Sequence, residues 1–201
     1  MSDPLPEAAA NDALTEAILD FIGQVPDTDE QPHRTPASRA RRIGNRIAAR
    51  AAFAAGGLSL PPGVFGWLTI LPELRTVWKQ QAQMVADIAG VHGRHADLSR
   101  EVMLYCLFRH IAPAAFRSLV RREGDAFVVR RATPQVLGAI VAKIAARVSL
   151  RLVGRGASRW LPFVGAVGVG GFAWIDTGRV AATAIELFGR PIVVTGGAHR
   201  R

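Results

Sequence analysis

The sequence predicts an all-α protein: a multi-helix bundle with two Gly/Pro-rich apolar helical hairpins, preceded by a flexible acidic N-terminal arm. Three observations support this fold class. Long segments repeat apolar residues at spacings of three and four, which is the period of an amphipathic α-helix. Two uncharged runs contain glycines and prolines that a straight spanning helix would not contain. The first 33 residues carry acids but no lysine or arginine, whereas the rest of the chain is strongly basic.

Composition limits the class of protein. With 201 residues, 49% of them apolar, the chain is long enough to bury one sizeable core, so we expect a single body. A single cysteine, Cys106, excludes an internal disulfide framework and suits a reducing cytoplasm. The N-terminus lacks a positive charge followed by an apolar run, so no signal peptide is expected. These features predict a cytoplasmic protein.

The charges are divided unevenly along the chain. Residues 1–33 hold eight acids, and residues 34–201 hold eight acids against all 25 lysines and arginines, a balance of +17. Such a body attracts phosphate-rich partners, either nucleic acid or an anionic membrane face. The alternative is that most of these charges only solvate the surface.

The N-terminal arm and linker cover residues 1–35. Within it, "NDALTEAILDFIGQV" has one short helical pattern, with Leu14, Ile18 and Phe21 on one face, and "PDTDEQPHRTP" is typical of a linker. The acids of this arm either mask basic residues of the body or belong to an ordinary disordered tail. The sequence leaves both hypotheses open.

The body, residues 36–190, contains two stripes of basic residues on predicted helices; residues 191–201 form a tail. The first stripe lies within the predicted helix "ASRARRIGNRIAARAAFAAGG", and the second lies within "QVLGAIVAKIAARVSLRLVG". Thr133 is the predicted N-cap of the second helix, and Pro134 is its first residue. The candidate membrane- or anion-binding residues of the two stripes are Arg39, Arg42, Arg46, Arg50, Lys143, Arg147 and Arg151.

Two further helices and one strand are predicted between these stripes. "ELRTVWKQQAQMVADIAGVHG" has the clearest helical period, with Gln81 inside its apolar arc. "DLSREVMLYCLFRHIAP" starts at Asp97 as N-cap and is apolar nearly all round, which is typical of a helix buried in the middle of a bundle. The segment "AFVVRRA", 126–132, is the one strand candidate, and we consider it too isolated to build a sheet.

The two uncharged runs are the most unusual feature. Residues 51–72 are 22 uncharged positions, but Pro61 and Pro62 lie midway, and an interior proline costs a helix roughly 3 kcal/mol. The second run, 160–175, is short for a span. We therefore expect kinked helical hairpins, which either pack together as a soluble core or dip into one leaflet, with Trp67 and Trp174 as the residues that insert.

An acid follows each uncharged run: Glu73 after the first and Asp176 after the second. An unpaired buried carboxylate is costly, so both are predicted to form structural ion pairs, with arginines of the basic stripes as the favoured partners. The alternative is that each carboxylate interacts with the positive end of a helix dipole.

No catalytic motif, cofactor site or metal site is predicted. The sequence has no dinucleotide fingerprint, phosphate loop or nucleophile elbow. His92, His95 and Asp97 lie within six residues, but a histidine at a helix C-terminus and an N-capping aspartate explain them without a metal. Cys106 and His110 are four residues apart, as a nucleophile and its base would be, yet the apolar helix around them favours inert packing.

Two segments of the body resemble the EcsC family of bacterial proteins. They are "GVFGWLTILPELRTVWKQQAQMVADIAGVHG" and "WLPFVGAVGVGGFAWIDTGRVAATAIELF", which together cover about half of the body. The chain departs from the family pattern in Pro61 and Pro62, before the first glycine of that segment, and in its long acidic arm. The resemblance implies a mainly helical, membrane-associated protein of undefined biochemical role, and it supplies no catalytic residue.

The sequence thus predicts a non-enzymatic cytoplasmic protein, peripheral on the inner face of the cell membrane. Its expected partners are an anionic lipid surface or a membrane protein, with self-association into a homo-oligomer as a further expectation. The alternatives are a basic helical protein that binds nucleic acid and a lipid-modifying enzyme without a recognisable motif.

Overall fold

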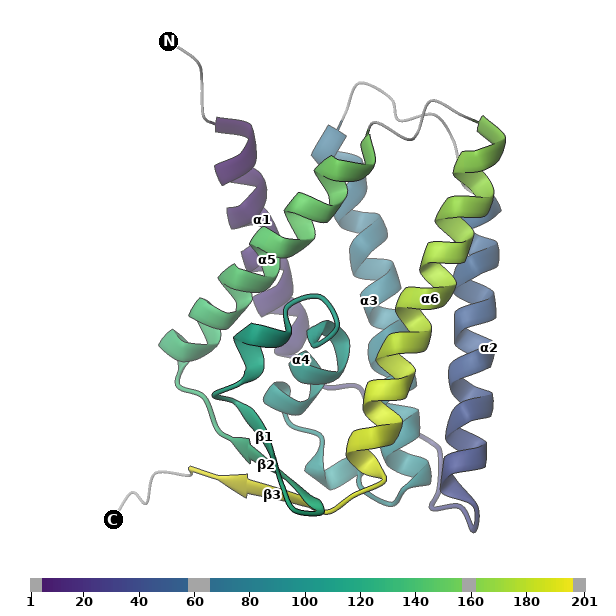
Figure 1. The fold of residues 1–201 in the computed structure, drawn as a ribbon, viewed down its shortest axis with the longest axis vertical. Coiled ribbons are helices and arrows are strands. Elements are labelled where there is room, and N and C mark those ends of the chain that lie inside the picture. The colour runs from purple at the N-terminus through teal and green to yellow at the C-terminus, as the bar shows by residue number, and fades with distance from the viewer. Residues whose placement is uncertain (1–4, 58–65, 157–161, 197–201) are drawn as a thin grey trace.

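The computed structural model describes residues 5–57, 66–156 and 162–196 and is predominantly helical (Figure 1). This confirms the predicted mainly helical fold. The helices are α1 (Leu5–Ile22), α2 (Pro36–Gly57), α3 (Gly66–Val91), α4 (Arg100–Phe108), α5 (Pro134–Gly156) and α6 (Pro162–Phe188). The shorter elements are the 3-10 helices η1 (His95–Asp97) and η2 (Pro113–Phe116) and the strands β1 (Val120–Glu123), β2 (Ala126–Arg130) and β3 (Ile192–Thr195).

The long helices pack around α4. The most extensive helix contact joins α2 and α6, α3 packs against both, and α1 lies along α5. Every residue of α4 after Arg100 is buried, as expected for a helix that is apolar nearly all round. In the middle of this core Trp78 of α3 meets the ring of Phe108 of α4 edge-on, with ring centroids 5.5 Å apart.

The N-terminus of α4 differs from the prediction. Its N-cap is Ser99, whose hydroxyl accepts a hydrogen bond from the backbone N–H of Val102 at 3.3 Å. Asp97, the predicted cap, instead ends η1 and pairs with Arg94 at 3.4 Å. Because η1 uses residues 95–97 for its own turn, the α-helix begins later. By contrast, Thr133 caps α5 as predicted, accepting from the N–H of Val136 at 3.4 Å.

The all-α prediction is wrong in one respect, because the chain contains a three-stranded sheet. β2 pairs antiparallel with β1 and parallel with β3, in the order β1-β2-β3. Gly124, at φ +58°, makes the turn between the first two strands. The segment 126–132 looked isolated because one partner strand is rich in arginine and the other follows α6, more than 60 residues later along the chain.

The predicted flexible arm is also a folded element where its side chains are described. Leu14, Ile18 and Ile22 of α1 are fully buried in the core, and Phe21 packs on Trp78 with ring centroids 6.1 Å apart. The following linker is held against α3, since Thr28 donates a hydrogen bond to Asp87 at 2.7 Å. The apolar face of α1 is therefore buried in the core, although the acids of this segment suggested a solvated tail.

The two hairpin predictions fall largely outside the described structure. Residues 58–65 and 157–161 lie between α2 and α3 and between α5 and α6, so the hairpins stay a prediction. The described parts show that α3 begins at Gly66 and continues through Pro72 rather than starting at Glu73. Within the described residues, no helix is long and apolar enough to cross a membrane.

Four helices end on the same side of the bundle. Figure 1 shows the C-terminal ends of α2 and α5 and the N-terminal ends of α3 and α6 together at the top of the view. The small sheet lies toward the opposite side. The bundle therefore brings together the flanks of both uncharged runs of the sequence.

Candidate functional site

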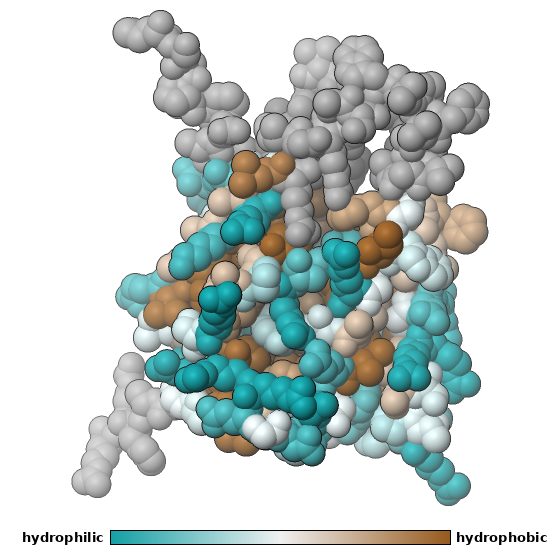
Figure 2. Space-filling view, in the orientation of Figure 1, coloured by the Kyte–Doolittle hydropathy of each residue, from teal (hydrophilic) through white to brown (hydrophobic). Residues whose placement is uncertain are grey.

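Large apolar side chains are exposed on the helices that end on this side. The exposed fraction is 84% for Phe53 of α2, 65% for Leu150 of α5, and 52% and 44% for Ile175 and Trp174 of α6. Figure 2 shows apolar side chains bordering the grey residues at this end and a broad hydrophilic band over the lower part of the same face. We call the side of the bundle where Phe53 and Leu150 are exposed the apolar end; Trp174 and Ile175 lie near the middle of α6, farther from that side. Large exposed apolar side chains at one end of a bundle are a candidate site of interaction.

Basic side chains accompany the apolar residues on two helices. Arg50 precedes Phe53 by three residues on α2, and Arg147 precedes Leu150 by three residues on α5; both arginines are exposed. Residues three apart in a helix are surface neighbours. Since α2 and α5 both run toward the apolar end, each arginine lies about 4.5 Å farther from that end than its apolar neighbour. The two helices thus repeat one amphipathic arrangement.

Most of the basic residues predicted to bind an anion are exposed to solvent. Arg42, Arg46 and Arg50 on α2 are exposed, as are Lys143 and Arg147 on α5. The side chains of Arg151, Trp67 and Glu73 lie outside the described ones, so their predicted roles stay predictions.

Arg39 differs from the rest of the stripe. Glu30 of the linker holds its guanidinium through two contacts, of 2.6 and 3.2 Å. This hydrogen bond and the charge of Glu30 raise the pKa of Arg39. An acid of the N-terminal segment therefore neutralises one of the predicted anion-binding residues.

A polar cluster joins three helices below the apolar end. His110, just beyond the end of α4, contacts an oxygen of Asp176 of α6 through Nε2 at 2.7 Å. The amide Nε2 of Gln81 of α3 donates to the other oxygen of Asp176 at 3.1 Å and to the hydroxyl of Thr177 at 3.2 Å. The pair of His110 and Asp176 is largely shielded from solvent. This cluster fixes α6 against α3 and α4.

Asp176 is therefore paired through His110 and Gln81, two partners that the prediction from the sequence missed. His110 was weighed only with Cys106, and Gln81 was visible in the sequence as the one polar residue inside the apolar arc of α3. An amide on an otherwise apolar face indicates a buried polar partner, because an unsatisfied amide would be costly there. That partner lies 95 residues away along the chain, and no local pattern identifies it.

The thiol and the histidine cluster show no catalytic or metal-binding geometry. Cys106 is fully buried, and burial raises the pKa of its thiol, which keeps it protonated and unreactive. His92 contacts the carbonyl oxygen of Ile88 at 2.8 Å, and His95 contacts that of Pro26 at 3.0 Å. In the part of the chain that the structure describes, no group of three metal-binding side chains is found.

The first turn of α4 contains a buried carboxylate, Glu101. Its oxygen accepts a hydrogen bond from the backbone N–H of Ala132 at 3.1 Å, which ties α4 to the segment before α5. Burial alone raises the pKa of Glu101, but hydrogen bonds from backbone N–H groups and from Ser99 outweigh it, and the net pKa is lowered. Glu101 therefore stabilises the fold as a carboxylate.

Replacing Glu101 with glutamine is expected to lower the free energy of unfolding by about 1–3 kcal/mol at pH 7. Because the folded-state pKa of this group lies below its ordinary value of 4.5, its contribution is present above that pH and is lost as the pH falls through the folded-state pKa. Urea unfolding of both proteins at pH 7 and pH 3 measures the difference, which should shrink at the lower pH. A difference independent of pH would show that the charge of Glu101 is not stabilising.

Comparison of the chain with protein-family models, curated proteins and solved structures found no match. The resemblance to the EcsC family therefore stays a prediction.

Proposed function

We propose that the protein binds the anionic face of a membrane through its apolar end, as a non-enzymatic peripheral membrane protein. The observation that carries this proposal is the repeated pairing of an exposed arginine with an exposed apolar side chain, Arg50 with Phe53 and Arg147 with Leu150. A membrane interface offers apolar chains at one depth and phosphates a few ångströms farther out, which matches this order.

The distances along the helices support shallow insertion. Phe53 precedes the last residue of α2 by four positions and Leu150 precedes that of α5 by six, which places both within about 10 Å of the helix ends. The uncharged first half of α6, residues 162–175, is roughly 21 Å long, which is shorter than a ~30 Å hydrocarbon core.

The magnitudes predict reversible, salt-sensitive binding. Full burial of a side chain the size of leucine or phenylalanine contributes about 1.5–3 kcal/mol, and each basic residue near an anionic surface contributes about 1 kcal/mol. Neither the apolar residues alone nor the basic residues alone give strong binding. The protein should therefore need both its apolar and its basic residues.

Liposome flotation tests the proposal. Wild-type protein should float with anionic vesicles at low salt, less at high salt, and least with neutral vesicles, since salt screens the attraction. Replacing Phe53 and Leu150 with serine should weaken binding to both kinds of vesicle. A charge-reversal variant should lose binding to anionic vesicles only; its four changes are Arg46→Glu, Arg50→Glu, Lys143→Glu and Arg147→Glu.

The control is a charge reversal at Arg121 and Arg122, two exposed residues of β1 on the side of the bundle away from the apolar end. This control should retain most of the binding. If it loses as much binding as the four-residue variant, the apolar end is not the binding surface. A gel shift with nucleic acid, in the absence of flotation, would favour the nucleic-acid alternative instead.

A further inference from the structure

A groove lies between the C-terminal end of α4 and the outer face of α6. It measures about 350 Å³ and is open to solvent on one side. Its lining combines two arginines, one histidine and one hydroxyl with a single carboxylate. These residues, together with one alanine and one proline, are Arg109, His110, Pro113, Arg179, Ala182, Thr183 and Glu186.

The two arginines of the groove have different surroundings. Arg109 is held in place, since its guanidinium donates to Glu186 at 2.8 Å and lies 5.4 Å from the centre of the Tyr105 ring. Arg179 is exposed, and among the described residues no carboxylate lies within ion-pair distance of it. Counting Arg109, Arg179 and Glu186, the groove carries one net positive charge. Such a lining fits an anion, because a planar guanidinium can donate two hydrogen bonds to a phosphate.

Exposed apolar side chains of α6 lie one helical turn before the groove. Ile175 precedes Arg179 by four residues and is therefore its neighbour on the same face of the helix. Ile175 and Trp174 are both exposed. A ligand whose phosphate contacts Arg179 can thus lay an apolar chain along Ile175, toward the apolar end.

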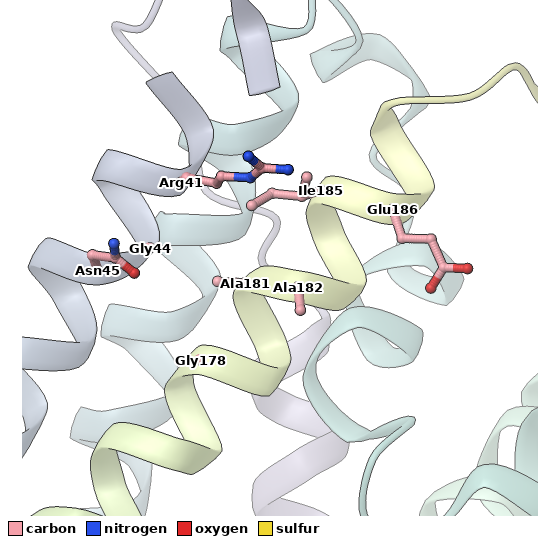
Figure 3. Close-up of a pocket in the computed structure, with 8 residues that line it drawn as sticks. All are labelled: Arg41, Gly44, Asn45, Gly178, Ala181, Ala182, Ile185 and Glu186. Atoms are coloured by element: carbon pink, nitrogen blue, oxygen red, sulfur yellow. The ribbon is translucent and has the colours of Figure 1, made fainter. Parts of the chain in front are cut away.

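A second groove, on the other side of α6, lacks these features. Figure 3 shows Arg41 of α2 extending toward Ile185 across a floor of small residues, while the carboxylate of Glu186 points away from α2. This groove is narrow at its base because α2 and α6 are in close contact at Gly44. Its lining holds one cation, Arg41, and one carboxylate, Glu186, so this groove carries no net positive charge.

We propose that the groove between α4 and α6 binds the headgroup of an anionic phospholipid, with the phosphate on Arg179 and Arg109 and an acyl chain on Ile175. This inference deepens the proposed function and rests on it, since it gives the membrane-bound protein a specific lipid site.

Titration with water-soluble short-chain lipid tests the site without a membrane. Calorimetry below the critical micelle concentration should show dihexanoyl phosphatidic acid binding more tightly than dihexanoyl phosphatidylcholine or inorganic phosphate. Arg179→Gln should weaken the phosphatidic acid about tenfold, because loss of one charge-assisted contact corresponds to roughly 1.4 kcal/mol. Arg121→Gln, an exposed residue of β1 with the same change of charge, should bind as the wild type does.

A second variant separates the two sources of phosphate. Ile175→Ser should weaken phosphatidic acid and leave inorganic phosphate unchanged. If Arg179→Gln and Arg121→Gln bind phosphatidic acid equally, the phosphate is not bound at Arg179. If inorganic phosphate binds as tightly as phosphatidic acid and Ile175→Ser has no effect, the lipid assignment is wrong. Either result, with wild-type flotation retained, overturns this inference while leaving the proposed function in place.

Discussion

Replacing Ile18 with alanine is expected to lower the free energy of unfolding by about 2–5 kcal/mol. Ile18 has no exposed surface and belongs to the central core, so the smaller side chain leaves a cavity among residues from several helices. Denaturation with urea, followed by circular dichroism, measures the change.

The neighbouring residue Leu19 provides the matched control. It lies on the same helix and undergoes a similar change to alanine, but its exposed fraction is 37%. We expect a loss of less than about 1 kcal/mol for Leu19→Ala, because a partly exposed side chain loses less burial and leaves no closed cavity. Equal small effects at both positions would mean that α1 does not belong to the core.

This role of α1 changes how the masking hypothesis has to be tested. Deleting residues 1–33 would remove core side chains together with the acids, and any change in vesicle binding would then reflect unfolding. Among the described residues, the acid of the N-terminal segment that contacts a predicted anion-binding arginine is Glu30, which pairs with Arg39. Glu30→Gln frees this arginine without touching the core and is therefore the cleaner change.

Replacing Gly44 with alanine is expected to destabilise the fold by about 1–3 kcal/mol, the usual cost of inserting a methyl group into a packed contact. A Cβ atom at Gly44 would lie 2.7 Å from the Cβ of Ala181, so α2 and α6 would have to separate. Thermal unfolding gives the direction of the change directly.

Gly138 of α5 serves as the control for this substitution. A Cβ atom there meets nothing within 4 Å, so Gly138→Ala should stabilise the protein by up to about 1 kcal/mol through its better helix propensity. If both substitutions are stabilising, α2 and α6 are not in such close contact.

The features that could be predicted from the sequence are those set by local periodicity. The repeat of apolar residues gave α3 and α5, and the all-round apolarity of the segment ending at Phe108 gave a central helix. The spacing of the arginines placed Arg42, Arg46 and Arg50 on one exposed face of α2. These patterns depend on residues one or two helical turns apart. At these positions the helix propensity and the pattern of burial favour the same structure.

The features that were missed depend on residues distant in the sequence. β2 needs β3, which follows α6, and Asp176 meets His110 across 66 residues. The acidity of the N-terminal segment suggested a solvated tail, but the exposed acids Asp12, Glu16 and Asp20 lie on one side of α1 while the buried Leu14 and Ile18 lie on the other. The basic groove between α4 and α6 was missed for the same reason, because it forms only when the end of α4 packs beside α6.

Entry of the apolar end into the membrane interface can be measured with an environment-sensitive label on α2. The native Cys106 is fully buried, so a nitrobenzoxadiazole label goes to an introduced cysteine. Phe53→Cys places the label at the apolar end, and Ser38→Cys places it at an exposed position about 22 Å back along the same helix. With anionic vesicles, the emission of the label at position 53 should shift to the blue and rise, while that at position 38 stays as in buffer. An equal response at both positions, or a response at position 38 alone, would contradict the account.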